Sequence, residues 1–413
     1  MHTLKPTARI RQRFHAIIFF LTLSVTVSHS SIADDSALLK TLSDIPATSL
    51  LMVDQFGHHH DALNPDTPLI PASTLKILTA WLALEHWGVQ HHFMTDFFLD
   101  KNQVLWIKGY GDPFLISEEI DLIAQKLRES GLQQVRGIRV DNHYFSRNIK
   151  IDGQTATDNP YDAVSGSLAA NFNTIYLKKT ANRISSAETQ TPVTATTIRT
   201  GKRLNKGKHR VNIKNAEEGA IYFAEILKQM LIEKGVKVSG SIQQEKIPNG
   251  LTPYYQHQNQ HSLDDIIAAM LQYSTNFIAN QLFLILGAEE YDAPATLEKS
   301  QQYVQSQVTS QLGWENFRML DGAGLSRKNR ITSRQLTQLL QRFKPYRHLM
   351  PSRMPGVSAK TGTLHNVSSY AGYLNHAGQA AIFALIINAK VPANLRFEVA
   401  RQLQNQLTPT LER

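Results

Sequence analysis

A serine and a lysine stand three residues apart where an apolar stretch of the chain begins. The segment Ser73–Lys76 reads Ser-Thr-Leu-Lys, follows Pro71, and is continued to Trp87 by apolar residues at helical spacing. On a helix, side chains three apart share a face, so the Lys76 amine can reach the Ser73 hydroxyl and act as its base. The free backbone N–H groups at a helix start also suit an oxyanion. The alternative is an ordinary helix start, in which this pattern occurs by chance.

A second short motif, Ser274–Asn276 (Ser-Thr-Asn), interrupts a long apolar stretch. Residues 263–286 are apolar at helical spacing on both sides of it, which indicates two helices with a break around 273–276. At such a break, the side chains of Ser274 and Asn276 can point into a cleft instead of a core. The alternative is a plain helix cap, because serine, threonine and asparagine are common capping residues.

The third motif, Lys360–Thr363 (Lys-Thr-Gly-Thr), lies in a strand predicted over 357–364. Alternation places Thr361 and Thr363 on one face of this strand and Lys360 and Gly362 on the other. Hydroxyl groups on a cleft face suit a substrate carboxylate, and a glycine lets the strand approach its neighbours closely. An ordinary edge strand is the alternative.

These motifs need a helix start, a break between helices and a strand that meet in space. The hydrophobic pattern predicts helices over 74–87, 117–130, 216–234, 263–286 and 394–406, and strands over 49–53, 104–107, 138–140, 357–364, 369–374 and 381–387. The last three strands follow one another closely, so we expect them in one antiparallel sheet. The chain is therefore predicted to mix helices and strands.

The bulk composition is that of a folded protein with more than one compact unit. At 413 residues the chain exceeds what one hydrophobic core usually organises. It contains no cysteine, which excludes disulfides, thiolate metal sites and a cysteine nucleophile. The formal net charge is +9, but no nucleic-acid-binding motif accompanies it, so we expect no nucleic-acid partner.

The first 33 residues have the features of an export signal. Four cations between residues 5 and 13 precede an apolar run over 16–27, and small residues up to Ala33 suit cleavage. An uncleaved membrane anchor is the alternative, but this run is short for a span of about 20 residues. We therefore expect a signal peptide over 1–33 and a periplasmic or otherwise extracytoplasmic protein. No other long apolar run follows, so membrane contact is expected to be peripheral at most.

A polar, threonine-rich and basic stretch covers residues 180–214. It contains seven cations and no acid between 199 and 214. A loop or a small subdomain fits this composition. Attraction to anionic wall polymers or lipid headgroups is one interpretation, and a solvated basic loop is the other.

Two short histidine runs, His58–His60 and His91-His92, contain side chains that can bind metals. Their neighbours are polar, and no partner motif completes a ligand set. A surface turn is the simpler interpretation of each run.

Together, the three motifs in this order resemble those of class C low-molecular-mass penicillin-binding proteins, the D-alanyl-D-alanine carboxypeptidase/endopeptidase family. The similarity extends to Gly109–Pro113, Val140–Phe145, Asn171–Thr174 and Asp321–Ser326, and it covers nearly all of the chain after residue 33. The resemblance implies an α/β (α+β) fold of the penicillin-binding transpeptidase-like, beta-lactamase-like type, with an antiparallel sheet flanked by helices and a helical lobe. It also implies a discontinuous peptidase domain over 34–98 and 255–413, with a smaller α/β domain inserted over 99–254.

By the same resemblance, the protein is expected to cleave D-alanyl-D-alanine ends of peptidoglycan stem peptides through an acyl-enzyme on a serine. The implied catalytic residues are Ser73, Lys76, Ser274, Asn276 and Lys360, and the implied substrate-binding residues are Thr361, Gly362 and Thr363. Lys76 is the base in this scheme, and no metal or cofactor is needed. Beta-lactams are expected as covalent inhibitors because they imitate the D-alanyl-D-alanine terminus.

Three features depart from the family pattern. Asn280 stands where a glutamate is expected and Ala323 where a serine is common. The segment between Tyr176 and Arg210 is too short for the additional small domain that family members usually carry. These departures concern substrate preference and the extra domain, while the core chemistry is unaffected.

Two other functions are compatible with parts of the pattern. A beta-lactamase shares serine acylation, but the glutamate-rich loop of class A is missing, and class C enzymes are expected to carry a tyrosine in place of Ser274. A degenerate peptidase that only binds peptidoglycan is the second alternative. The intact Ser73, Lys76 and Lys360 argue against it.

Overall fold

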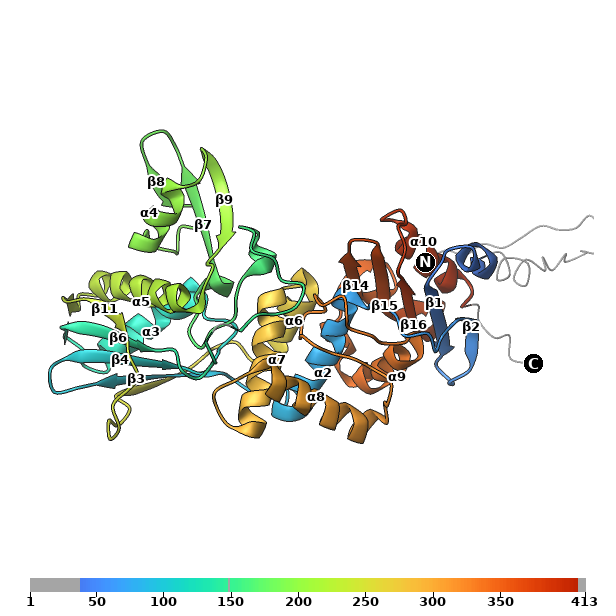
Figure 1. The fold of residues 1–413 in the computed structure, drawn as a ribbon, viewed down its shortest axis with the longest axis horizontal. Coiled ribbons are helices and arrows are strands. Elements are labelled where there is room, and N and C mark those ends of the chain that lie inside the picture. The colour runs from blue at the N-terminus through green and yellow to red at the C-terminus, as the bar shows by residue number, and fades with distance from the viewer. Residues whose placement is uncertain (1–37, 148, 408–413) are drawn as a thin grey trace, which may run out of the picture.

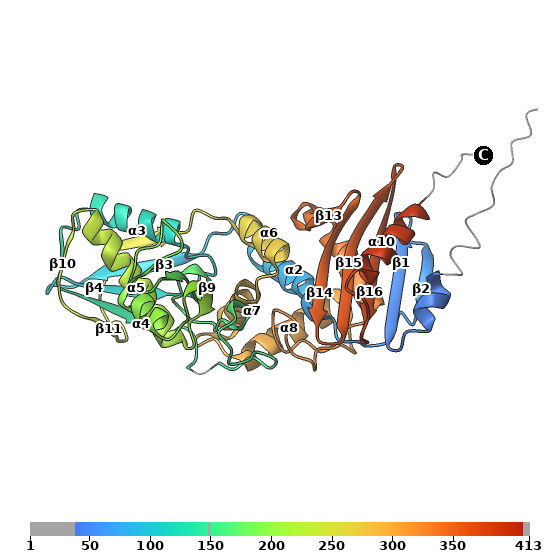
Figure 2. The same cartoon turned by 90° about the horizontal axis from the view of Figure 1, so that it is seen from above.

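The computed structural model describes residues 38–147 and 149–407, and the expected signal peptide over 1–33 lies outside them. The described residues form an elongated molecule with a sheet towards each end and a group of helices between the sheets (Figure 1, Figure 2). The predicted mixture of helices and strands is confirmed. One sheet combines strands from both ends of the chain, which leaves the middle of the chain to form the other.

The six-stranded sheet is antiparallel, with its strands in the order β13-β14-β15-β16-β1-β2. They are β1 (Thr48–Asp54), β2 (His59–Leu63), β13 (Ser352–Met354), β14 (Val357–Leu364), β15 (Val367–His376) and β16 (Gln379–Ile387). The predicted antiparallel arrangement of β14, β15 and β16 is confirmed by their pairing. β1 lies beside β16, with Thr48 opposite Ile387.

Both faces of this sheet are covered, which is why its strands are apolar without a regular alternation. On one face, Leu50 and Phe383 belong to the core formed with α10 (Leu395–Asn405). On the other face, Ile386 belongs to the core of the helical lobe, next to α9 (Ser333–Phe343). Side chains from alternate strand positions therefore serve two separate cores.

The helical lobe consists of α9 and four further helices: α2 (Lys76–Trp87), α6 (Leu263–Tyr273), α7 (Asn276–Tyr291) and α8 (Leu297–Leu312). α7 is buried on every side from Asn276 to Ala288, so it is the central helix of the lobe. α6 begins with a capping box, in which Ser262 and Asp265 accept hydrogen bonds from each other's backbone N–H groups.

The inserted unit is built on a second sheet of five strands, in the order β11-β6-β4-β3-β12. Its strands are β3 (Met94–Leu99), β4 (Val104–Gly109), β6 (Gly137–Asp141), β11 (Ile242–Gln244) and β12 (Tyr255–Gln258), with a short parallel pair, β5 (Gln134–Val135) and β10 (Lys237–Val238), beside it. Two helices, α3 (Ser117–Glu129) and α5 (Ala216–Glu233), share the apolar core of this unit (Figure 1).

The pairing of β3 with β12 moves the boundaries of the inserted unit. Phe97 lies opposite Tyr255, and the two strands pair along the whole of β12. Both strands therefore belong to the inserted sheet. We place the ends of this unit at about 94 and 258, outside the expected limits of 99 and 254.

A small third sheet rises from the inserted unit between residues 174 and 212 (Figure 1). Its central strand β7 (Thr174–Lys179) pairs with β8 (Ile184–Ser186) and β9 (Gly207–Asn212), and α4 (Ala195–Lys202) packs against it. Of the two expectations for this basic stretch, the small subdomain is therefore correct. Three of its seven cations pair with acids: Arg199 with Glu218, Arg210 with Glu188 and Lys214 with Asp158.

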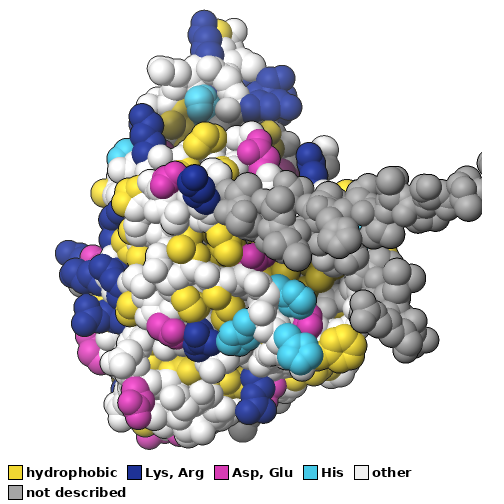
Figure 3. Space-filling model, turned by 90° about the vertical axis from the view of Figure 1, so that its right-hand side faces the viewer, with side chains coloured by type: hydrophobic (Ala, Val, Ile, Leu, Met, Phe, Trp, Pro, Cys, Tyr) yellow, Lys and Arg dark blue, Asp and Glu magenta, His cyan; other side chains and the backbone are white. Residues whose placement is uncertain are grey.

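The histidine run 58–60 lies at the turn into β2, on the end of the molecule where histidine side chains gather in Figure 3. His58 Nδ1 and His60 Nε2 lie 3.2 and 2.9 Å from Asp54 Oδ2. Within the described ranges, no group of three or more histidine or acidic side chains is arranged to hold a metal ion. In the same ranges, no helix combines the length and apolar character needed to cross a bilayer.

Candidate active site

The Lys76 amine is fully buried at the first turn of α2, among oxygen atoms from three segments of the chain. Its Nζ lies 2.9 Å from Ser73 Oγ, 2.8 Å from Asn276 Oδ1 and 2.8 Å from the Ala323 carbonyl oxygen. Burial and the nearby charge of Lys360 hold the pKa of Lys76 well below the usual lysine value, although the Asp321 carboxylate acts in the opposite direction. The predicted pairing of Ser73 with Lys76 is therefore present.

A short 3-10 turn, η1 (Ala72–Leu75), presents Ser73 ahead of α2. The turn is tied to β15, because the hydroxyls of Thr74 and Ser369 both donate to the Pro71 carbonyl, at 2.7 and 2.6 Å. The predicted helix over 74–87 thus begins as a tighter turn that is fastened to the sheet. This places Ser73 at the junction of the lobe and the sheet.

The carbonyl that contacts Lys76 is held in place by Asp321. The Asp321 carboxylate, fully buried, accepts hydrogen bonds from the backbone N–H groups of Ala323, Leu325 and Ser326 at 2.9 Å each. From the sequence, the segment Asp321–Ser326 was identified only as part of the family resemblance, and no role was predicted for it. Because Ala323 contributes its backbone oxygen, the loss of the usual serine side chain leaves this contact intact.

The predicted break at Ser274–Asn276 is confirmed. α6 ends at Tyr273, Ser274 has a left-handed backbone (φ 56°), and no side chain caps α7 at Thr275. Instead, Ser274 Oγ accepts a hydrogen bond from Lys360 Nζ at 2.8 Å. The motif therefore turns its side chains towards the other two motifs.

Lys360 connects β14 to this break. Its side chain is 1% exposed and donates both to Ser274 and to the Thr361 carbonyl oxygen, at 2.8 Å each. Burial, assisted by the charges of Arg353 and Arg396, lowers the pKa of Lys360 to about 7.

Gly362 is the point at which β14 comes closest to Ser73 in the turn η1. A Cβ atom at this position would lie 2.9 Å from Ser73 N, 2.8 Å from the Pro71 carbonyl oxygen and 2.2 Å from Ser369 Oγ. Only glycine fits there without movement of the backbone. The sequence predicted that glycine would let this strand approach its neighbours closely. In the structure, the neighbour that β14 approaches at Gly362 is the turn that carries Ser73.

The alternation predicted for the third motif is present, but Lys360 and Gly362 are the residues that face Ser274 and Ser73. The predicted cleft-side position of Thr361 and Thr363 is not observed, because their face of β14 is the one that packs with α10. Thr363 Oγ1 accepts a hydrogen bond from Arg396 Nη2 at 2.9 Å, and Arg396 Nη1 donates to the Gly362 carbonyl oxygen at 2.8 Å. Arg396 is 7% exposed, and no carboxylate of the described residues pairs with it. A cavity of about 290 Å³ adjoins this pair and is also lined by Ser368.

The inserted unit contacts Asn276 through a short turn, η2 (Pro160–Asp162). Asn276 Nδ2 donates to the Tyr161 carbonyl oxygen at 3.1 Å, and the Tyr161 side chain is 59% exposed. Sequence reasoning did not select this residue, because it lies in a polar, turn-rich stretch with no motif of its own.

A family model matches the chain over most of its length. The model of the D-Ala-D-Ala carboxypeptidase 3 (S13) family matches residues 59–209, 200–351 and 346–408. The chain belongs to this family. The match confirms the resemblance inferred from the three motifs and the predicted class of serine-type carboxypeptidase.

Similar proteins and structures agree with this assignment. A D-alanyl-D-alanine carboxypeptidase of Actinomadura sp. (strain R39) is 24% identical over 397 residues, covering 78% of this chain and 73% of that protein. The D-alanyl-D-alanine carboxypeptidase DacB of Haemophilus influenzae is 26% identical over 205 residues, covering 44% and 43%. The crystal structure of penicillin-binding protein 4 from Haemophilus influenzae has a TM-score of 0.74 at 20% identity, over 90% of this chain and 99% of that chain. This likeness confirms the predicted fold.

Proposed function

We propose that this protein is a serine D-Ala-D-Ala carboxypeptidase/endopeptidase that acts outside the cytoplasm on peptidoglycan stem peptides, through an acyl-enzyme on Ser73. The observation that carries the proposal is the buried Lys76 amine at 2.9 Å from Ser73 Oγ. Two similar proteins are named D-alanyl-D-alanine carboxypeptidases, and one similar structure is a complex with a beta-lactam. The same serine is therefore the proposed target of beta-lactams.

Lys76 acts as the base in its neutral form. A neutral amine has two N–H donors and one lone pair, whereas Asn276 Oδ1 and the Ala323 carbonyl oxygen can only accept. These two oxygens take the two N–H groups, so the lone pair is left for the Ser73 hydroxyl. The lowered pKa of Lys76, caused by burial and by Lys360, favours this neutral form.

Ser73 attacks the carbonyl carbon of the penultimate D-alanine and passes its proton to Lys76. The backbone N–H groups of Ser73 and Thr363 hold the oxyanion that forms. The close approach of Gly362 to Ser73 N supports this role, because a Cβ at position 362 would lie only 2.9 Å from that nitrogen. β13 pairs only with Val357 and Ser358, so the far end of β14 has a free edge for substrate.

When the tetrahedral intermediate collapses, the bond to the leaving nitrogen breaks and that nitrogen takes a proton relayed by Ser274. The hydrogen bond from Lys360 occupies the Ser274 oxygen and leaves the Ser274 hydrogen free for this transfer. Asn276 positions Lys76 and binds the substrate backbone. Water then hydrolyses the ester on Ser73, and no step needs a metal or cofactor.

The terminal carboxylate of the substrate is assigned to Thr361 and Thr363. Arg396, which has no acid partner among the described residues, holds the Thr363 hydroxyl oxygen from the face of β14 opposite Lys360 and Gly362. A carboxylate bound here would be neutralised by a cation that lacks any other acid. This arrangement favours substrates with a free C-terminus.

Labelling with penicillin tests the proposal directly. The purified protein is treated with a fluorescent penicillin, digested and mapped by mass spectrometry, and a stable adduct on Ser73 is expected. A protein that hydrolyses the drug rapidly would be a beta-lactamase, and one that is never labelled would be a binding module. Digestion of cross-linked muropeptides then separates release of terminal D-alanine from cleavage of cross-links.

A further inference from the structure

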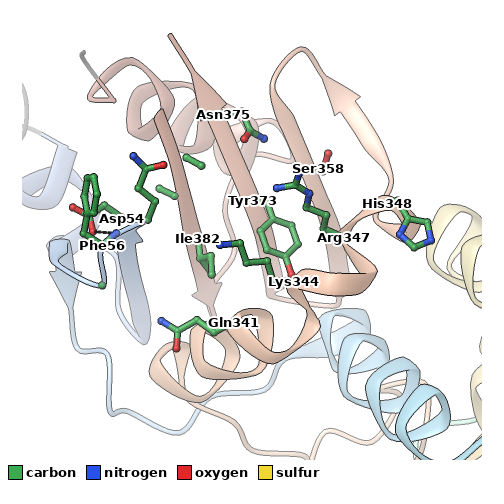
Figure 4. A pocket seen from close by; sticks show the side chains of 14 residues that line it. Asp54, Phe56, Gln341, Lys344, Arg347, His348, Ser358, Tyr373, Asn375 and Ile382 are labelled. Atoms are coloured by element: carbon green, nitrogen blue, oxygen red, sulfur yellow. Dashed lines mark hydrogen bonds between the residues drawn. The ribbon is translucent and has the colours of Figure 1, made fainter. Parts of the chain in front are cut away.

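A cavity of about 610 Å³ opens beyond the end of α9 (Figure 4). It lies on the face of the six-stranded sheet that packs against the helical lobe. Its floor contains Tyr373, Ile382 and Ser358. Its walls are the turn after β1, residues 54–57, on one side and residues 344–348 on the other. Ser358 lies four residues before Gly362, so this floor begins about 13 Å along β14 from the contact with Ser73.

Two exposed cations and one hydrogen-bonded carboxylate line this cavity. Lys344 and Arg347, in η4 (Lys344–Leu349), are exposed, and among residues 38–147 and 149–407 neither head group has an ion pair or a hydrogen bond. Asp54, on the facing wall, is already occupied by two imidazoles and by the backbone N–H groups of Phe56 and His58. His348 contacts Asp264 at 3.3 Å. An anion in the cavity would therefore meet two cations that are not neutralised.

The apolar surfaces determine what kind of anion fits. The buried ring of Tyr373 and the side chain of Ile382 form an apolar floor, and Phe56 is 69% exposed at the rim. A compact inorganic ion would leave this surface uncovered. A peptide that carries carboxylates next to small apolar side chains would cover the floor and reach the cations at the same time.

We propose that this cavity is a second, non-catalytic binding site for an acidic peptide segment of peptidoglycan, held by Lys344 and Arg347. The choice of ligand rests on the proposed function, because stem peptides place alanine beside acidic residues. The site is separate from Ser73, so it binds a different stem peptide from the one being cut. It keeps the enzyme on its polymeric substrate and raises the local concentration of further peptide ends.

Calorimetry with a short acidic fragment tests this site apart from catalysis. The probe is N-acetyl-L-alanyl-D-glutamate, which lacks a D-alanyl-D-alanine end, titrated into protein with and without saturating penicillin. We expect penicillin to leave binding unchanged, and the variant Lys344→Gln/Arg347→Gln to weaken it about tenfold or more, as the loss of two ion pairs predicts. The matched control is Arg342→Gln, which removes an exposed cation of α9 that does not line the cavity.

Four outcomes would overturn the proposal, and the first three concern the acidic probe. They are equal binding by the double variant and the wild-type protein, loss of binding when penicillin is present, and equal displacement of the probe by inorganic phosphate. An uncharged probe, N-acetyl-L-alanyl-D-glutamine amide, should bind much more weakly, and equal affinity would also contradict the assignment. If the double variant unfolds, Arg347→Gln alone replaces it. Failure of penicillin labelling would instead contradict the proposed reaction, so the two failures are distinguishable.

Discussion

Arg396 Nη2 donates to Thr363 Oγ1 at 2.9 Å, so the guanidinium fixes the direction of the threonine hydroxyl. Because the oxygen accepts this bond, the hydroxyl hydrogen is free to be donated to a ligand. Arg396 is nearly buried and has no acid partner in the described ranges, so its charge acts on whatever enters the cavity beside Thr363. The pair is suited to recognition of a carboxylate.

Replacing Arg396 should therefore affect substrate binding more than turnover. For Arg396→Ala, we expect KM for a D-alanyl-D-alanine peptide to rise about tenfold or more with a smaller fall in kcat, since a charge-assisted contact to carboxylate is lost. Arg396→Lys should recover part of the effect because it keeps the charge. The control substrate is the same peptide with an amidated C-terminus. Equal losses for the acid and the amide would mean that Arg396 only supports the fold.

Ser73 and Lys76 should behave as one catalytic unit. Ser73→Ala removes the proposed nucleophile, and Lys76→Met removes the base while keeping a side chain of similar length, so each should lower peptidase activity by about a thousandfold or more. The double variant should be no worse than either single one. Both proteins should stay folded by circular dichroism. Penicillin labelling that persists in folded Ser73→Ala would refute this mechanism.

The titration of Lys360 predicts a limit on activity at alkaline pH. Its pKa is lowered to about 7, so raising the pH through that value removes the charge that assists Ser274. The quantity kcat/KM should therefore fall above about pH 7, whereas protonation of Lys76 should limit it on the acid side. Lys360→Arg retains its charge and should move the alkaline limb upward. An unchanged alkaline limb in this variant would assign the titration to another group.

Raising the pH has the opposite effect on stability: deprotonation of Lys360 is expected to lower activity but to stabilise the fold. An unfolded lysine titrates near 10.5, and the folded Lys360 near 7. Between these values the unfolded chain binds more protons, so the contribution of Lys360 to the free energy of unfolding rises with pH from about 7 to about 10.5. Chemical denaturation of wild-type protein and Lys360→Met at several pH values measures this contribution.

Gly362→Ala should disturb the site through the backbone. The new Cβ would lie 2.9 Å from Ser73 N and 2.2 Å from Ser369 Oγ, so β14 or the turn η1 must shift. We expect acylation by penicillin to slow by at least about a hundredfold, since a small displacement of a reacting group is costly. Gly137→Ala is the matched control, because its nearest contact is the flexible end of Arg139 at 3.3 Å. Equal acylation rates for both variants would contradict the proposed approach of strand and serine.

Motifs with a fixed spacing were predictable because their geometry is local. The Ser73–Lys76 contact depends on one helical turn, and the two faces of β14 depend on strand alternation. The break between α6 and α7 follows from the interruption of an apolar pattern. Each of these features could be predicted without knowing how distant segments pack.

Contacts made through the backbone or across the fold were not predictable. The oxygen of Ala323 is held by Asp321, and no property of the alanine side chain indicates this. The sequence did contain one indication of Arg396 that the analysis did not use. Positions 396, 399, 400 and 403 share the buried face of α10, and a cation is unusual on such a face. The helix α8 carries few apolar residues, so its pattern was too weak to predict. In α9, Leu336, Leu339, Leu340 and Phe343 stand at helical spacing, a signal that the sequence analysis did not use.

The pairing of β1 with β16 joins residues near the two ends of the described chain. Thr48 and Ile387 face each other although more than three hundred residues separate them. A sheet with such distant neighbours closes late, because the whole loop between them must first be brought together. The inserted unit has no such requirement, since its outer strands pair within their own segment. During synthesis, the insertion should therefore fold first, and the proposed nucleophile should remain inactive until β16 has been synthesised and can pair with β1.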